Sequence, residues 1–336
     1  MEKKFLIFVN SPLQLICAIE AVMKHLPSFD NAEFIFGTDI RRLPQEDQIA
    51  SLYGIKLKKW STPAKNLFLK ATHHFLYILR LRRRYKGIEN LVIGDFRNPR
   101  SHALYSALKP RNVILVDDGF ETYERLCSKE SKLIHYGFNF QDLNIRYFPF
   151  IGRIKLQELQ IFSFLARNFS LSDITLNEFL YTKSMFKNLL SSKKMTSSYA
   201  IIVGTRASEA GSIQLNQEID LIEQTFELLQ NKGFKRVIYF ANRLNSSTKL
   251  QIIEQMMPVV IPNNMLELWL LEQEDLPCII AAFGSTALIT IPMIFPDVKP
   301  ILFSYPDELI PHEHKASYNK FVKYLKENLV DRIRLN

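Results

Sequence analysis

The sequence predicts an α/β protein built from two doubly wound, mostly parallel sheets. Short apolar, β-branched runs alternate along the chain with segments of helical period, and this order is typical of parallel sheets that carry helices on both faces. The chain has 336 residues, more than a single core usually organises. A polar stretch at 191–198 interrupts the alternation, as a linker between two domains would.

The first set of elements opens with a strand at 5–9 that leads into a capped helix. Asn10-Ser11-Pro12 follows this strand. Ser11 is a residue type that caps helices, and Pro12 fits a first helical position. The apolar stripe of 13–25 predicts the helix itself. By the same criteria we expect strands at 33–37, 90–93 and 112–116, and helices at 44–53, 64–85 and 101–107.

The second set of elements opens with a strand at 200–205. Further strands are expected at 236–240, 259–261, 278–282 and 300–303, and helices at 218–230, 250–255, 265–273, 287–291 and 315–334. The intervening segment has helical propensity and no strong strand pattern. The predicted organisation is an N-terminal domain at 1–155, a helical linker at 156–198, a second domain at 199–310 and a C-terminal helix at 311–336 that packs back on the first domain. Two Rossmann-like domains that face an interdomain cleft form the GT-B architecture.

The composition indicates a globular protein of a reducing compartment. Apolar residues make up 47% of the chain and charged residues 23%, which excludes a disordered protein. The cysteines Cys17, Cys127 and Cys278 are widely spaced and odd in number, so neither a disulfide framework nor a metal site is predicted, and a cytoplasmic location is expected. The apolar run near the N-terminus is too short for a signal peptide or a membrane span.

The net charge of +9 favours polyanionic partners. Basic residues cluster at the end of an apolar, aromatic run at 68–81: Arg80, Arg82, Arg83, Arg84 and Lys86. This pattern is typical of an amphipathic helix on a membrane surface. It is equally typical of a core helix whose last turn carries cations that favour its dipole, and both interpretations stay open. No nucleic-acid-binding module is recognisable.

One acidic motif follows a predicted buried strand directly. The strand at 112–116 ends in Asp117-Asp118-Gly119, and ligands of open α/β sheets bind at the carboxyl ends of the strands. Two adjacent carboxylates repel each other, so one of them can have a raised pKa and accept a proton near neutral pH. Asp-Asp-Gly is also common turn chemistry, so a plain turn is the alternative.

The second domain contains a candidate phosphate site. Gly284-Ser285-Thr286 follows a predicted strand and begins a helix, where backbone N–H groups point toward anions. The alternative is a hydroxyl that merely caps the helix. Gly204 ends another strand and would allow a ligand close to the backbone, or it marks an ordinary turn. Glu267 lies near a helix start, where it could bind a ribose diol or simply favour the helix dipole.

Taken in order, these motifs resemble those of bacterial sialyltransferases and polysialyltransferases. The resemblance is strongest to glycosyltransferase family 52, the lipooligosaccharide α-2,3-sialyltransferases, and covers about residues 5 to 305. The matching segments are 10–15 after the first strand, Asp117-Asp118-Gly119, Gly204, Glu267 and Ser285-Thr286.

The resemblance implies an inverting, metal-independent transfer of sialic acid from CMP-sialic acid to a sugar hydroxyl of a surface glycan or lipooligosaccharide. It implies Asp118 as the general base, with Asp117 as the alternative. Acceptor binding is expected in domain 1–155 and nucleotide-sugar binding in domain 199–310. The expected substrate-binding residues are Asn10, Ser11, Gly119, Gly204, Thr205, Arg243, Glu267, Ser285 and Thr286.

No cofactor and no metal is expected beside the donor. The expected partners are a nucleotide-sugar donor, a glycan or glycolipid acceptor and an anionic membrane surface, and no nucleic acid; a homodimer is left open. The expected location is the cytoplasm, on the inner face of the inner membrane.

The sequence departs from the family pattern at one position. The family carries a His-Pro motif after the second strand of its nucleotide domain, and the corresponding residues here are Ala241 and Asn242, followed by Arg243. The histidine contacts the donor phosphate in the family. Arg243 could supply charge to a phosphate, but a guanidinium could not act as a general acid. A different donor, such as another CMP-nonulosonate or a UDP-hexose, and a non-catalytic glycan-binding protein therefore remain as alternatives.

Overall fold

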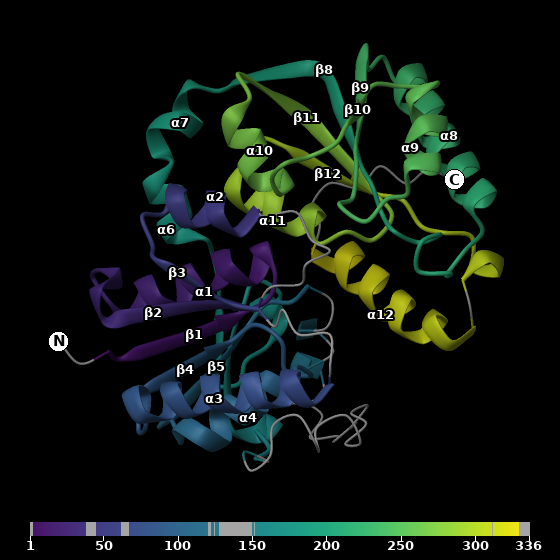
Figure 1. The fold of residues 1–336 in the computed structure, drawn as a ribbon. Coiled ribbons are helices and arrows are strands. Elements are labelled where there is room, and N and C mark those ends of the chain that lie inside the picture. The colour runs from purple at the N-terminus through teal and green to yellow at the C-terminus, as the bar shows by residue number, and fades with distance from the viewer. Residues whose placement is uncertain are drawn as a thin grey trace. The chain divides into compact units, whose positions relative to one another are not determined.

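The computed structural model (Figure 1) describes residues 3–37, 45–61, 67–119, 122–123, 125–127, 150, 152–310 and 312–328. The chain divides into two compact units, Met1–Tyr181 and Thr182–Asn336. Each unit is built on its own parallel sheet, as the alternation of strands and helices predicts. Within the described residues, no helix combines the length and the apolar character that a membrane span needs.

The first unit has a seven-stranded sheet in the order β3-β2-β1-β4-β5-β6-β7. Its strands are β1 (Phe5–Val9), β2 (Ala32–Gly37), β3 (Leu57–Trp60), β4 (Asn90–Ile93), β5 (Asn112–Val116), β6 (Leu159–Ser163) and β7 (Ile174–Leu176). Its α-helices are α1 (Pro12–His25), α2 (Gln45–Leu52), α3 (Leu67–Tyr85) and α4 (Pro99–Leu108), and Phe29–Asn31, Leu156–Glu158 and Ala166–Asn168 are single 3-10 turns. α1 and α2 cover one face of the sheet, and α3 and α4 cover the other (Figure 1).

Buried apolar runs explain why the central strands of this unit form. Every residue of β1, β2 and β4 is buried, as expected for parallel strands that are covered on both faces. The predicted cap of the first helix is confirmed: Ser11 Oγ accepts from the backbone N–H of Gln14 at 3.3 Å, and Pro12 begins the helix. The chain therefore turns sharply at the carboxyl end of β1.

The second unit has a five-stranded sheet in the order β10-β9-β8-β11-β12. Its strands are β8 (Lys194–Val203), β9 (Arg236–Phe240), β10 (Val259–Val260), β11 (Asp275–Ala282) and β12 (Lys299–Leu302). Its helices are α7 (Lys187–Ser192), α8 (Leu215–Asn231), α9 (Ser247–Glu254), α10 (Leu266–Glu272), α11 (Ala287–Ile294) and α12 (His312–Asn328), with a 3-10 turn at Asp307–Leu309; the unit boundary falls inside α6 (Leu180–Met185). α8 and α9 lie on one face, and α10 and α11 on the other (Figure 1).

The segment 156–198 differs from the expected helical linker. Its first half contains β6 and β7, and β6 pairs with β5 in the register Val113↔Leu159. The polar stretch at its end contains the start of β8, where Lys194 pairs with Asp275 of β11. Pairing with a neighbouring strand overrides local propensity, and that pairing involves residues far away in the sequence. The prediction of a helical linker without a strong strand is therefore wrong for these strands, although α6 (Leu180–Met185) and α7 (Lys187–Ser192) do lie in the segment.

The strand order in each sheet reverses at one point. In the first unit the reversal lies between β1 and β4, and in the second between β8 and β11. The carboxyl ends of the strands at such a point are where ligands of doubly wound proteins bind. Asn10 follows β1, Gly204 follows β8 and Phe283 follows β11, so the motifs at these positions lie at the expected edges.

Candidate functional site

In the first unit, a fully buried carboxylate lies at the carboxyl end of β5. Asp117 is 0% exposed. Its Oδ1 accepts a short hydrogen bond from Ser163 Oγ, and its Oδ2 accepts from the backbone N–H of Phe164 at 2.8 Å. The thiol of Cys17 in α1 contributes a further hydrogen bond. Asp117 thus joins β5 to the end of β6 and to α1.

The two carboxylates of the motif, Asp117 and Asp118, have different environments. Burial raises the pKa of Asp117 to about 7, although its hydrogen bonds from Ser163, Phe164 and Cys17 act in the opposite direction. The charge of Asp118 contributes to the rise. Asp118 itself is half-buried, and its backbone N–H donates to Thr122 Oγ1 at 2.8 Å. Asp118 is therefore the carboxylate of the pair that a substrate can reach more easily.

Glycines make room for the polar residues that follow β1. A Cβ added to Gly37, at the end of β2, would collide with Asn10 Oδ1, and one added to Gly94, after β4, would collide with the side chain of Gln14. The backbone N–H of Asn10 donates to Gln14 Oε1 at 2.7 Å. Gly119, which follows the carboxylate pair, has a φ of +67°, a backbone conformation that glycine adopts without strain. Asn10, Ser11 and the carboxylates therefore share the carboxyl edge of one sheet, two strands apart.

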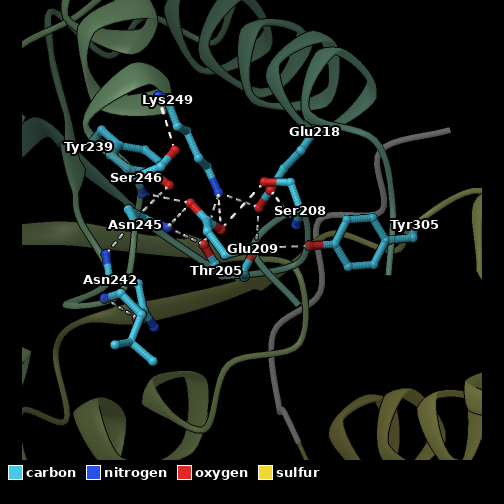
Figure 2. Close-up of polar contacts among 11 residues, drawn as sticks. Thr205, Ser208, Glu209, Glu218, Tyr239, Asn242, Asn245, Ser246, Lys249 and Tyr305 are labelled. Carbon is cyan, nitrogen blue, oxygen red and sulfur yellow. Dashed lines mark hydrogen bonds and ion pairs between the residues drawn. The ribbon is translucent and has the colours of Figure 1, made fainter. Parts of the chain in front are cut away.

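In the second unit, a buried lysine organises the loop after β8 (Figure 2). The side chain of Lys249 is 0% exposed, and its Nζ lies 2.7 Å from Glu218 Oε1 and 3.4 Å from Glu209 Oε2. The same Nζ donates to the backbone carbonyl of Thr205 at 3.0 Å. Burial opposes the ionisation of Glu218, but the hydrogen bonds from Lys249, Ser208 and Thr205 outweigh it and hold the pKa of Glu218 below its ordinary value.

The hydroxyl of Thr205 has one hydrogen-bond partner as a donor and another as an acceptor. It donates to Glu218 Oε1 at 2.7 Å, so Tyr305 Oη, 2.9 Å away, must donate to it. Asn245 also holds the loop, because its Nδ2 donates to the carbonyl of Thr205 at 2.7 Å. The space beside Gly204 is taken by Tyr239 Oη, which a Cβ would approach to 2.6 Å. Close packing against Tyr239 therefore explains why position 204 is a glycine.

The predicted phosphate motif begins α11. Gly284 has a φ of +85°, which favours glycine. Ser285 Oγ accepts from the backbone N–H of Ala287 at 3.2 Å, whereas Thr286, the cap residue, makes no capping hydrogen bond with its side chain. Both hydroxyl residues are half-buried. The motif thus presents a helix N-terminus and two hydroxyl groups at the carboxyl end of β11, as an anion site requires.

Glu267 lies in the first turn of α10 and is buried. Its Oε1 accepts a short hydrogen bond from Thr290 Oγ1 in α11. Burial raises the pKa of Glu267, with this hydrogen bond acting against the rise. The carboxyl group therefore links α10 to the helix that carries the phosphate motif.

The residues that stand in place of the His-Pro motif follow β9. Ala241 is 2% exposed, and its backbone N–H donates to the carbonyl of Val260 at 2.9 Å. Asn242 Oδ1 accepts from the backbone N–H of Leu244 at 3.0 Å, and Arg243 is half-buried. The described residues contain no group of three or more His, Cys, Asp or Glu side chains that could hold a metal ion.

Sequence reasoning missed Glu218, Lys249 and Tyr305 as members of this region. The sequence did contain a signal for Glu218 and Lys249. Glu218 shares the buried stripe of α8 with Ile222 and Leu229, and Lys249 shares that of α9 with Ile253. A charged residue on an apolar stripe is almost never fully buried unless it is paired, so each helix indicated a buried partner without showing which one.

Comparison with known proteins adds evidence on the fold. No family model matches the chain, and no curated protein matches it. Among solved structures, an α/β-galactoside α-2,3-sialyltransferase from Photobacterium phosphoreum is similar, with a TM-score of 0.55, 13% identity and 99% of each chain covered. A putative UDP-N-acetylglucosamine 2-epimerase from Listeria monocytogenes has a TM-score of 0.52 and 13% identity, with 98% of this chain and 89% of that chain covered.

A UDP-GlcNAc 2-epimerase from Methanocaldococcus jannaschii, solved with UDP-GlcNAc and UDP, has a TM-score of 0.51 and 14% identity over 97% of this chain and 92% of that chain. At these identities the likeness concerns the fold. The predicted fold of two Rossmann-like α/β units is confirmed by the two parallel sheets and by this likeness.

Proposed function

We propose that this protein is an inverting, metal-independent glycosyltransferase that moves sialic acid from CMP-sialic acid to a sugar hydroxyl of a surface glycan or lipooligosaccharide. The observation that carries the proposal is the pair Asp117-Asp118 at the carboxyl edge of the first sheet. Asp117 is buried among internal donors, and Asp118 beside it is only half-buried. A carboxylate next to another negative group is a better proton acceptor than an isolated one.

The reaction assigns one role to Asp118. Its carboxylate takes the proton of the acceptor hydroxyl while the hydroxyl oxygen bonds to the anomeric carbon of the sialic acid. The bond between that carbon and the phosphate oxygen of CMP breaks, and its electron pair goes to the phosphate. Because attack and departure take place on opposite faces, the anomeric configuration inverts.

The second unit is proposed to hold the donor. The N-terminus of α11, with Ser285 and Thr286, would stabilise the phosphate of the departing CMP. Arg243 would supply positive charge to it, and Glu267 would accept a hydrogen bond from the ribose. Thr205 has a different proposed role: its hydroxyl is committed to Glu218 and Tyr305, so it holds the loop after β8 in place.

A different donor is the second candidate. Ala241 stands where the resembled family has a histidine on the donor phosphate, and it is the observation that favours another CMP-nonulosonate or a UDP-hexose. A non-catalytic glycan-binding protein would share the fold. Transfer assays with a panel of nucleotide sugars, together with calorimetric titration of CMP, CDP, UDP and GDP, separate these candidates. Tighter binding of cytidine nucleotides supports the first proposal, and equal binding of all four contradicts it.

The decisive variant is Asp118→Asn, which removes the proton acceptor and keeps the shape of the side chain. We expect turnover to fall by about 10²–10⁴-fold, the usual contribution of a general base, while CMP binds with unchanged affinity. Asp220→Asn is the matched control, because Asp220 is exposed on α8, and it should leave turnover unchanged. An Asp118→Asn enzyme with full activity would show that another group is the base.

A further inference from the structure

The outer face of α3 exposes apolar side chains. Leu69 is 56% exposed and Leu76 is 47% exposed. They are seven residues apart, so they lie on the same face of the helix. Thr72, His73 and Arg80 on this face are exposed as well. The inner face is a normal core face, since Ile78 and Leu81 are buried. α3 therefore has a solvent-facing stripe that its packing in the sheet layer does not use.

The same helix contains no acidic residue. Its cations are Lys70, Arg80, Arg82, Arg83 and Arg84, and Lys86 follows it directly. Among the described residues, no carboxylate forms an ion pair with Arg80, Arg83 or Lys86. Attraction to the helix dipole accounts for cations in the last turn. It does not account for leucines exposed on the same face.

The turn after α4 places further cations next to the end of α3. The backbone N–H of Gly87 donates to the carbonyl of Leu108 at 2.7 Å, and that of Arg111 donates to the carbonyl of Ile88 at 3.1 Å. These bonds bring the turn after α4 against the end of α3. We call five of the exposed cations in this region the basic patch: Arg80, Arg83, Lys86, Lys109 and Arg111. One exposed acid, Glu89, lies among them.

We propose that the outer face of α3 and the basic patch bind the surface of an anionic phospholipid bilayer. Exposed leucines beside arginines match the two layers of such a surface: the leucines enter the boundary of the acyl chains, and the cations meet the lipid phosphates. A nucleic-acid surface would use the cations and leave the leucines in water. This inference concerns where the protein acts and holds for any donor or acceptor.

The test is sedimentation of the full-length protein with vesicles. Phosphatidylcholine vesicles with and without phosphatidylglycerol are the probes, at low and high salt. We expect binding to the anionic vesicles that weakens with salt. The variant Arg80→Gln/Arg83→Gln/Lys86→Gln should bind about 100-fold more weakly, since each basic residue near the surface contributes roughly 5-fold. Lys232→Gln/Lys235→Gln/Lys320→Gln, which removes three exposed cations of the second unit, should bind nearly as the wild type does.

The apolar part has its own variant. Leu69→Ser/Leu76→Ser should weaken binding to anionic vesicles and keep its salt dependence, and both exposed substitutions should leave the melting temperature unchanged. Wild-type binding that is equal for neutral and anionic vesicles overturns the proposal. So does a leucine variant that binds as tightly as the wild type, or duplex DNA that displaces the vesicles from the basic patch.

Discussion

Asp117 in the first unit and Glu218 in the second are both inside the protein, yet their pKa values move in opposite directions. Asp117 is 0% and Glu218 is 1% exposed, and each accepts several hydrogen bonds. The donors to Asp117 are a hydroxyl, a thiol and a backbone N–H, and burial raises its pKa to about 7. Glu218 adds a contact with Lys249 at 2.7 Å, and its pKa falls despite burial.

The difference shows what offsets the loss of water around a buried carboxylate. At Asp117 neutral donors reduce the penalty without cancelling it. At Glu218 the buried ammonium group of Lys249 acts together with the donors Ser208 and Thr205, and the shift is reversed. Glu218 and Lys249 together connect α8, α9 and the loop after β8, which is a structural task. Asp117 has no described cation beside it and adjoins Asp118. Asp117 therefore has an unfavourable environment directly beside Asp118, the proposed proton acceptor.

The largest change in stability is expected when the ammonium group of Lys249 is removed. Lys249→Met leaves Glu218 buried without its cation, and we expect the free energy of unfolding to fall by about 3–5 kcal/mol. Urea denaturation at neutral pH measures this loss. The double variant Glu218→Gln/Lys249→Met should recover much of it, because no unpaired charge is left. Lys232→Met, at an exposed position of the same unit, is the control and should change stability by less than about 0.5 kcal/mol. A Lys249→Met protein as stable as the wild type would contradict the assigned role.

The second test uses pH. Because the pKa of Asp117 is raised in the folded protein, this group lowers stability as pH rises from about 4 to about 7, by at most about 1.4 kcal/mol per pH unit. Asp117→Asn removes that loss. The stability of the variant relative to the wild type should therefore increase with pH over this range and stay constant above it. Glu218 has the opposite sign, since its contribution is present above the unfolded value and is lost as pH falls through its folded pKa.

Urea denaturation of Asp117→Asn and the wild type at several pH values measures the difference. Titrating groups that do not interact with Asp117 are common to both proteins and cancel. A relative stability that does not change with pH would show that Asp117 keeps an ordinary pKa in the folded state.

The sequence predicted those features of the fold that depend on local pattern. The buried run 112–116 became β5, the Ser11 cap begins α1, and two parallel sheets form as expected. The strands β6 and β7 were missed because they form by pairing at the edge of a sheet, a long-range contact that the local propensity of 156–198 does not show. The motifs with Asp118 and Ser285 could be proposed from the sequence because they lie within three residues of a strand end, and their roles stay predictions. Lys249 was missed because its partner Glu218 lies in another helix and only the fold brings them together.

The smallest effect is expected at Tyr305, at the outer end of the buried network. Tyr305→Phe removes the hydroxyl that donates to Thr205 Oγ1 and leaves both the Thr205–Glu218 bond and the Glu218–Lys249 pair in place. The aromatic ring keeps its stacking on Phe283, with ring centroids 4.9 Å apart. We expect a loss of about 0.5–1.5 kcal/mol in urea denaturation, the usual net contribution of one hydrogen bond. A loss as large as that of Lys249→Met would contradict the conclusion that the buried ammonium group contributes more to the stability of this network than the Tyr305 hydroxyl does.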